Sequence, residues 1–437
     1  TRQARYDLGR MEALLERLGS PHADPVPTVH VAGTKGKGSV AAMVSAALTA
    51  QGLRPGLTTS PHLHTFRERI RVSGRPLPEG AFARLLEALW PTMEALNATG
   101  RWSPVTVFEV LTAMAFLHFR RARCGARVLE VGLGGRLDAT NVVPRPQVCV
   151  ITPVGLDHTA VLGGTVARIA AEKAGIVKPG ATVVAGLQPP EAMAVIEAAC
   201  AARGARLVRV VEAARWRAGE ATLEGQALTV ETSRRRYELW VPLLGWHQVE
   251  NAATAVDALE ALGEHGVALD EDAVARGLRR VRWPCRLEVL RRRPLVVADG
   301  AHNPEAVRRV GESLPRYLPH RRLLLVFGVS ADKDVGGMVA ELAPLAPRVF
   351  TARSRHPRAM PPEELAQRFR AAGCAAEAVG TTAEALARAL REARRGDLVL
   401  VTGSLFVAAE AREAVKGIAA EVYPELLPGQ PAPAPAP

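Results

Sequence analysis

Short apolar runs alternate with longer amphipathic stretches along most of the chain. Residues 28–32 form the first clear apolar run, and runs at 126–131, 148–152 and 182–185 have the same character. Residues 40–48, after the first run, carry apolar side chains at the spacing of one helix face. Strands that alternate with helices in this way are typical of a parallel, doubly wound sheet.

A second series of apolar runs occupies the last third of the chain. It predicts strands at 295–298, 323–327, 349–352 and 398–402, separated by helical segments. Between the two series, residues 211–239 alternate like antiparallel strands around a turn at Gly225. Residues 245–261, which follow, have helical spacing.

These patterns predict an α/β protein with two unequal parts. The first is a P-loop-type, mostly parallel sheet domain, which we expect over residues 1–289. A smaller Rossmann-like α/β domain follows over residues 290–427. The alternating Pro and Ala of residues 428–437 predict a disordered tail.

The net charge of +12 permits nucleic acid as a partner, but other features argue against it. Arginine clusters are spread along the chain, and aromatic residues make up only 4%, too few for base-stacking platforms. No apolar stretch approaches the ~18 residues that a membrane span needs, and residues 1–10 lack the apolar core of a signal peptide. The five cysteines are scattered singly. We therefore expect a soluble, cytoplasmic protein without a membrane partner, and nucleic acid is disfavoured as a partner.

Lysine is scarce in this chain. Only six of the 56 basic residues are lysines, and the others are arginines. A chain with this bias retains lysine mainly where a compact, modifiable amine is needed. Lys35, Lys37 and Lys173 are therefore candidates for chemistry.

A glycine-rich segment, Gly-Thr-Lys-Gly-Lys-Gly-Ser at residues 33–39, lies between the first predicted strand and helix. Backbone N–H groups of such a loop can turn toward an anion at a helix N-terminus. Lys37 can reach the outer phosphates and Ser39 can offer a hydroxyl to Mg²⁺, although Gly38 separates them, unlike in the usual P-loop. The alternative is a simple glycine-rich turn. The residues expected to bind nucleotide here are Thr34, Lys35, Gly36, Lys37, Gly38 and Ser39.

Glu130 and His158 follow two predicted strands, at the sheet edge where ligands of open α/β sheets bind. Mg²⁺ needs only one or two carboxylates in addition to nucleotide phosphates and water. The alternatives are a strand-end ion pair for Glu130 and a capping or core imidazole for His158.

Ten segments, in order along almost the whole chain, resemble the folylpolyglutamate synthase/dihydrofolate synthase family of the Mur ligase superfamily. In addition to the loop at 33–39 they are Thr59–Leu63, Glu68–Ile70, Phe108–Glu109, Glu130–Asn141, Leu156–Thr159, Glu172–Ile176, His247–Ala252, Asp299–Pro304 and Thr402–Leu405. The ordered set is far more specific than any one segment.

The resemblance implies two Mg²⁺ sites, with Ser60 and Glu130 at the first and His158 at the second. It also implies that CO₂ carbamylates Lys173, which becomes an anion beside the metal and a catalytic group with Lys37 and His302. An ordinary surface pair between Glu172 and Lys173 is the alternative. A monovalent cation is a further possible cofactor of the family.

The nucleotide and the amino acid have further implied partners. Asn251 would bind adenine, and Arg286 and Asp299 would reach phosphates and ribose. Cys285 stands where the family usually has glycine, which puts the position of Arg286 in doubt. His302 and Ser404 would orient the incoming glutamate; helix capping is the alternative for both.

A folate site is the last implication. Its expected lining residues are Pro61, His62, Thr106, Phe108 and Leu137. Phe108 would stack on the flat ring system, or else pack in the core above the helix that follows it.

The resemblance implies a monomeric, ATP-dependent ligase that adds L-glutamate to a reduced folate and to dihydropteroate through an acyl phosphate. Another Mur-type ligase acting on a UDP-sugar peptide is disfavoured, because the phosphate loop begins by residue 33 and leaves no room for a UDP-binding domain. A P-loop ATPase acting on nucleic acid is the other alternative.

Overall fold

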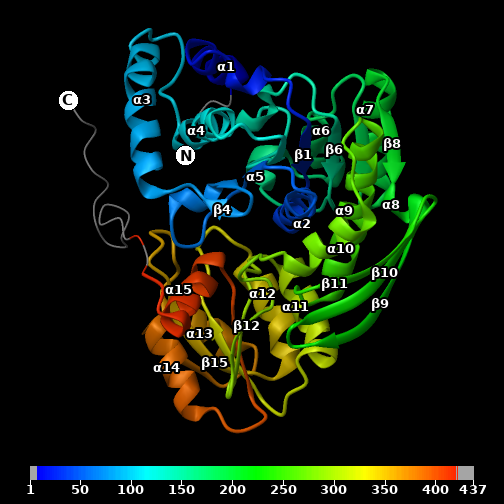
Figure 1. Ribbon diagram of the computed structural model, residues 1–437. Helices are drawn as coiled ribbons and strands as arrows, with labels where there is room; N and C mark the ends of the chain where they lie inside the picture. Colours follow the sequence, from blue (N-terminus) through cyan, green and yellow to red (C-terminus); the bar gives the residue numbers. More distant parts are fainter. Residues whose placement is uncertain (1–6, 420, 422–437) are drawn as a thin grey trace.

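The computed structural model describes residues 7–419 and 421, which form three β-sheets with helices packed against them (Figure 1). The largest sheet has the order β4-β3-β2-β5-β1-β6-β7-β8. Its strands are β1 (Thr28–Ala32), β2 (Pro55–Thr58), β3 (Ile70–Val72), β4 (Arg75–Pro76), β5 (Ala126–Glu130), β6 (Val148–Ile151), β7 (Thr182–Ala185) and β8 (Arg206–Arg209). The pairs are parallel except at the β2-β3-β4 edge.

Helices cover both faces of this sheet because its strands are apolar on both sides. In β6, Val148 and Val150 pack on one face and Cys149 and Ile151 on the other. The α-helices between residues 8 and 203 are α1 (Leu8–Arg17), α2 (Lys37–Ala50), α3 (Glu79–Asn97), α4 (Val107–Arg121), α5 (Thr159–Leu162), α6 (Val166–Ala174) and α7 (Pro190–Arg203). Short 3₁₀ turns are η1 (Pro21–Ala23), η2 (Phe66–Arg69) and η3 (Ala139–Val142).

A three-stranded antiparallel sheet follows, and it packs against α9 (Trp246–Glu264) on the α2 face of the first sheet. Its strands are β9 (Ala214–Thr222), β10 (Gly225–Thr232) and β11 (Arg236–Val241), flanked by α8 (Val210–Ala213) and α10 (Glu271–Arg280). Glycine at 225 has φ +154°, which suits the turn before β10.

The third sheet begins at Glu288 and has the order β12-β13-β17-β14-β15-β16. Its strands are β12 (Glu288–Arg292), β13 (Leu295–Ala298), β14 (Leu323–Phe327), β15 (Arg348–Arg353), β16 (Ala376–Thr381) and β17 (Leu398–Thr402). Only β12 is antiparallel to its neighbour. The accompanying helices are α11 (Pro304–Tyr317), α12 (Val335–Leu342), η4 (Ala343–Leu345), α13 (Pro362–Ala371), α14 (Thr382–Glu392) and α15 (Leu405–Lys416).

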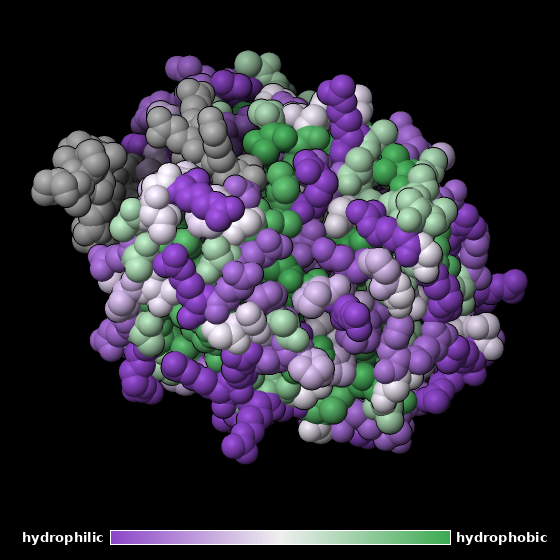
Figure 2. Space-filling model, turned by 90° about the horizontal axis from the view of Figure 1, so that it is seen from above, coloured by the Kyte–Doolittle hydropathy of each residue, from purple (hydrophilic) through white to green (hydrophobic). Residues whose placement is uncertain are grey.

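The α/β class and the apolar strands expected from the sequence are confirmed. The short or polar strands β2, β3, β4, β8, β12 and β16 were not expected, because they lack a long apolar run. The expected tail at 428–437 lies outside the described residues. No helix among the described residues combines the length and apolar character needed to cross a membrane. The face shown in Figure 2 is largely hydrophilic, with smaller hydrophobic patches.

Candidate active site

Two connected cavities lie between the carboxyl ends of the first and third sheets. One, of about 250 Å³, surrounds the phosphate loop, and the other, of about 560 Å³, extends toward α1 and α4. Loops that follow β1, β5 and β6 line them from one side, and loops that follow β13 and β17 from the other. The residues that line both cavities are Ser60, Pro61, Gly132, His158, Arg286, Gly300 and His302.

The phosphate loop depends on two glycines. Gly33 has φ +144° and passes so close to Thr152 that a Cβ would lie 1.8 Å from its hydroxyl. Gly36 has φ +82° and immediately precedes α2, where a Cβ would lie 2.4 Å from Asn251 Oδ1. Only glycine accommodates both the left-handed backbone and this close approach. The loop therefore exposes its backbone at the helix N-terminus.

Side chains of the loop point in different directions. Lys37 is the first residue of α2, and its Nζ donates to the Thr34 carbonyl at 3.4 Å. Ser39 is buried two residues later and lines the smaller cavity. Lys35 forms an ion pair with Glu305 of α11, which joins the loop to the third sheet's side of the cavity.

Glu130 ends β5 inside the smaller cavity, as expected for a group at this sheet edge. Burial raises the pKa of this carboxyl group, while the charges of Lys37 and Arg286 oppose the rise. Among the described residues, the Ser60 N–H donates a hydrogen bond to Glu130 Oε2 at 3.1 Å. The alternative of a strand-end ion pair is wrong within the described part of the chain, since Glu130 forms no salt bridge there.

Lys173 of α6 is buried, with 4% of its surface exposed, and its Nζ donates to the Gly33 carbonyl at 2.8 Å. Desolvation, and next the charge of Lys37, lower the pKa of this amine to about 7. Glu172 instead pairs with Arg136 through a 2.9 Å contact. The alternative of an ordinary Glu172–Lys173 surface pair is therefore wrong.

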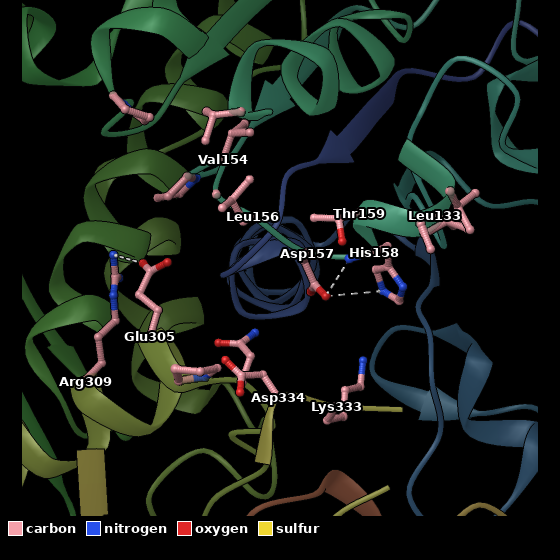
Figure 3. A pocket seen from close by; sticks show the side chains of 18 of the residues that line it. Leu133, Val154, Leu156, Asp157, His158, Thr159, Glu305, Arg309, Lys333 and Asp334 are labelled. Carbon is pink, nitrogen blue, oxygen red and sulfur yellow. Dashed lines mark hydrogen bonds and ion pairs between the residues drawn. The ribbon is translucent and has the colours of Figure 1, made fainter. Parts of the chain in front are cut away.

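His158 stands at the junction of the two cavities and an adjoining open cleft of about 1730 Å³ (Figure 3). Its side chain is 48% exposed, which excludes a core imidazole, and it makes no capping hydrogen bond to α5. Its backbone N–H donates to Asp157 Oδ1 at 2.9 Å. Burial lowers the pKa of His158, which favours a neutral ring able to bind a metal.

The nucleotide-binding candidates surround the smaller cavity. Asn251 is buried and its amide donates to Gln248 at 3.0 Å. Arg286 folds back so that Nη1 donates to the Cys285 carbonyl at 2.9 Å. Cys285 has φ +58°, a backbone conformation that glycine adopts without strain. The cysteine therefore strains the turn that positions Arg286.

Asp299 is buried, and both of its carboxylate oxygens are already used. Oδ2 accepts from the Leu287 N–H and Oδ1 from the Ala301 N–H, each at 2.8 Å. These bonds hold the residue after Arg286 and the residue before His302, so the two oxygens are not both free for ribose. Burial raises the pKa of Asp299, and the nearby Arg286 charge opposes this rise.

His302 and Ser404 both line the larger cavity, but only one of them caps a helix. His302 Nδ1 lies 2.9 Å from the Gly300 carbonyl and donates to it, which leaves Nε2 as the free nitrogen. Burial lowers its pKa. Ser404 is the N-cap of α15, and its hydroxyl accepts from the Phe406 N–H at 3.2 Å. Ser404 therefore caps α15 and also lines the cavity, and its role toward glutamate stays a prediction. Beside His302, the capping residue is Asn303.

The larger cavity contains four of the five residues expected to bind folate, namely Pro61, Thr106, Phe108 and Leu137. Phe108 is half-buried and packs directly on Gly132, so it belongs to both the cavity wall and the edge of the core. Thr106 caps α4 through a reciprocal pair of hydrogen bonds with Glu109. The cavity thus has one apolar wall and several polar groups, as small-molecule sites do.

His62 departs from the expectation. It lines a separate cavity of about 240 Å³ between η2 and α15. Arg69 Nε donates to its Nδ1 at 3.0 Å, and its ring packs on Phe66 with centroids 4.4 Å apart. These two contacts place the imidazole outside the larger cavity, although Arg69 and Phe406 line both cavities. The assignment of His62 to the folate site stays a prediction.

Sequence reasoning missed several residues of the site. Arg10 and Glu109 form a buried ion pair at 2.8 Å on the wall of the larger cavity. Asp138 accepts from the backbone of Gly132 and Leu133 and so shapes the loop after β5. Lys333 lines the same cavity, and the scarcity of lysine was the signal that could have identified it.

Comparisons with known proteins agree with this arrangement. Residues 82–259 match the Mur ligase middle domain, and residues 285–405 match the glutamate ligase domain of Mur ligases. The dihydrofolate synthase/folylpolyglutamate synthase of Bacillus subtilis is 35% identical over 94% of this chain and 95% of its own length. The chain belongs to the folylpolyglutamate synthase/dihydrofolate synthase family.

Other members of this family differ in length. A probable bifunctional folylpolyglutamate synthase/dihydropteroate synthase of Halobacterium salinarum is 41% identical over 91% of this chain, which spans only 48% of that relative. Among solved structures, Mycobacterium tuberculosis folylpolyglutamate synthase complexed with ADP superposes with a TM-score of 0.87 at 35% identity, covering 94% of each chain. The family relationship therefore extends over both large sheets.

Proposed function

We propose that this chain is an ATP-dependent ligase that adds L-glutamate to a reduced folate and to dihydropteroate. The observation that carries the proposal is the junction of the two cavities. The phosphate loop opens into one, the apolar wall with Phe108 forms the other, and seven residues line both. A nucleotide phosphate and an acceptor carboxylate bound there would meet within one enclosed site.

The proposed reaction has two steps. An acceptor carboxylate oxygen attacks the γ-phosphorus of ATP, which forms an acyl phosphate and releases ADP. The amine of glutamate then attacks the acyl carbon, and the C–O bond to phosphate breaks. Lys37 and the loop N–H groups neutralise charge on the transferred phosphoryl group.

Magnesium fits the residues around Glu130. The buried carboxylate accepts one backbone hydrogen bond and has no ion-pair partner among the described residues. Ser39 and Ser60 line the same cavity and can supply oxygen ligands. Within the described part of the chain, no group of three acidic, histidine or cysteine side chains forms a complete metal site. Mg²⁺ held by few protein ligands, water and phosphates would screen the negative charge that builds up there.

A carbamate on Lys173 is part of the proposal. The amine is buried beside the phosphate loop, and its hydrogen bond to Gly33 keeps it near Lys37 and His158. CO₂ reacts with a neutral amine, and a buried lysine favours that form. The carbamate would add a negative group beside Lys37, with His158 as the neutral ligand of a second Mg²⁺.

His302 is proposed to accept a proton from the incoming glutamate. Its Nδ1–H is committed to the Gly300 carbonyl, so Nε2 is available as the acceptor. Burial lowers its pKa and favours the neutral ring that a general base requires. Lys333 lines the same cavity and supplies a cation for a glutamate carboxylate.

Coupled assays test this function. ADP release is measured with ATP and Mg²⁺, with dihydropteroate or tetrahydrofolate monoglutamate as acceptor, and with or without L-glutamate. We expect sustained turnover only when acceptor and glutamate are both present. ADP release that requires neither the acceptor nor L-glutamate and increases when nucleic acid is added would contradict the ligase proposal.

A further inference from the structure

A further cavity, of about 340 Å³, is lined by four arginines and, among the described residues, by no acidic side chain. It lies beside α2, between the β3–β4 hairpin and the segment that follows α10. None of its lining residues lines the two cavities of the candidate active site. The arginines are Arg71, Arg75, Arg280 and Arg282.

Three of these arginines lack an acidic partner. Within residues 7–419 and 421, Arg75, Arg280 and Arg282 form no salt bridge and no side-chain hydrogen bond, and all three are exposed. Arg71 alone has an acidic neighbour, Glu68, at 3.6 Å. Like charges that share one concave surface repel one another, and a bound anion relieves this repulsion.

The cavity also has an apolar floor and an aromatic wall. Small side chains of α2, from Ala42 to Ala50, form the floor together with Leu57. Trp283 forms the wall, and the guanidinium of Arg71 lies 5.9 Å from the centre of its ring. Gly74, in the two-residue turn of the hairpin, leaves open space at the rim.

Trp283 connects this cavity with the phosphate loop. A Cβ added at Gly38 would lie 2.6 Å from Trp283 Cζ2, so the indole packs directly on the loop backbone at the start of α2. The guanidinium of Arg71 lies over the same ring. A ligand held between the arginines and the indole would therefore contact the side chain that supports the nucleotide loop.

We propose that this cavity is an accessory binding site for a small, multiply charged anion. Guanidinium groups form paired hydrogen bonds with carboxylates and phosphates alike, so both kinds of anion fit. If the anion carries carboxylates, it would be an oligo-γ-glutamate chain, and this choice rests on the proposed function. If it carries phosphates, it would be an inorganic polyphosphate. A volume of about 340 Å³ suits such a small ligand better than an extended polymer.

Titration calorimetry on the full chain tests the site. The active site is first saturated with the non-hydrolysable nucleotide AMPPCP, so that the phosphate loop is occupied. Tripolyphosphate and tetra-γ-glutamate are then titrated separately. We expect at least one of them to bind at one site per chain, and binding to be at least tenfold weaker in the Arg280→Ala/Arg282→Ala variant.

Arg276→Ala/Arg279→Ala is the matched control, because both arginines are exposed on α10 and neither lines the cavity. It removes the same charge and should leave the affinity within about twofold of the parent. No saturable binding of either anion, or equal weakening in both double variants, would overturn the proposal. Binding of an RNA oligonucleotide that needs Arg280 and Arg282, while both small anions fail, would also overturn it.

The readout is separate from turnover. The parent chain could bind the anion, lose this binding in the Arg280→Ala/Arg282→Ala variant, and yet show no ligase activity. That result would support the accessory site and refute only the proposed function. The melting temperature of both double variants should match that of the parent, because the four substituted side chains lie at the surface.

Discussion

Lys173 Nζ donates a 2.8 Å hydrogen bond to the carbonyl of Gly33, at the first residue of the phosphate loop. The contact joins α6 to the carboxyl end of β1 and holds a buried amine beside Lys37. A buried lysine without a carboxylate contact is costly as a cation. The arrangement therefore favours a modified or neutral side chain.

Lys173→Ala should reduce ligase turnover by at least 100-fold, because it removes the proposed carbamate. Short carboxylates such as formate or acetate should restore part of the activity. Lys178→Ala is the control, because Lys178 donates to the Asn141 carbonyl and lies outside both cavities. Full activity of Lys173→Arg, which cannot carry a carbamate, would contradict the assignment.

Lys37→Ala should lower kcat by about 10²–10³-fold, the range seen when one donor to a developing charge is removed. Its melting temperature should stay within a few degrees of the parent, since Lys37 makes a single long hydrogen bond with the described part of the chain. Lys416→Ala, at the end of α15, is the control for loss of a lysine. Near-normal kcat in the Lys37 variant would refute the phosphate-loop role.

Gly36→Ala should weaken ATP binding strongly, because the added methyl group meets Asn251. Gly52→Ala provides a matched comparison, since Gly52 has φ +88° but open space around it. Both variants carry backbone strain of about 1 kcal/mol. Only Gly36→Ala should raise the Kd for ATP, as measured by calorimetry, and equal Kd values would show that the close approach does not matter.

Phe108→Ala should raise KM for the pterin acceptor at least tenfold and leave ATP affinity nearly unchanged. Phe108 lines the larger cavity, whereas its neighbour Val107 is 64% exposed and does not. Val107→Ala is therefore the control. If Phe108→Ala lowers the melting temperature and impairs acceptor and ATP equally, its packing on Gly132 is the dominant role.

Cys285→Gly should be at least as stable as Cys285→Ala. At an ordinary buried position glycine is the less stable of the two by about 0.5–1 kcal/mol, but here φ is +58°. Urea unfolding of the two variants measures the difference. A clearly lower stability of the glycine variant would mean that the turn before Arg286 is not strained.

The apolar strands could be predicted from sequence because burial on both faces of a parallel sheet leaves a continuous apolar run. β2 begins at Pro55, and β8 has arginine at two of its four positions and is partly exposed, so neither carries such a signal. The phosphate loop and Glu130 could be located from strand–turn–helix order alone.

The finer geometry could not be predicted in this way. Whether His62 faces one cavity or the next depends on its contacts with Arg69 and Phe66, which sequence order does not specify. The same limit applies to Arg10, which reaches its partner Glu109 across 99 positions of the chain. Such long-range contacts come from packing, so only the structure reveals them.

An isotope-transfer experiment tests the central claim most directly. The acceptor is labelled with ¹⁸O in its reacting carboxylate and incubated with ATP, Mg²⁺ and L-glutamate, and the released phosphate is analysed by mass spectrometry. Attack of the carboxylate on the γ-phosphorus predicts one ¹⁸O atom in the phosphate for each amide formed. Amide formation with unlabelled phosphate would contradict the acyl-phosphate route and the account built on the two joined cavities.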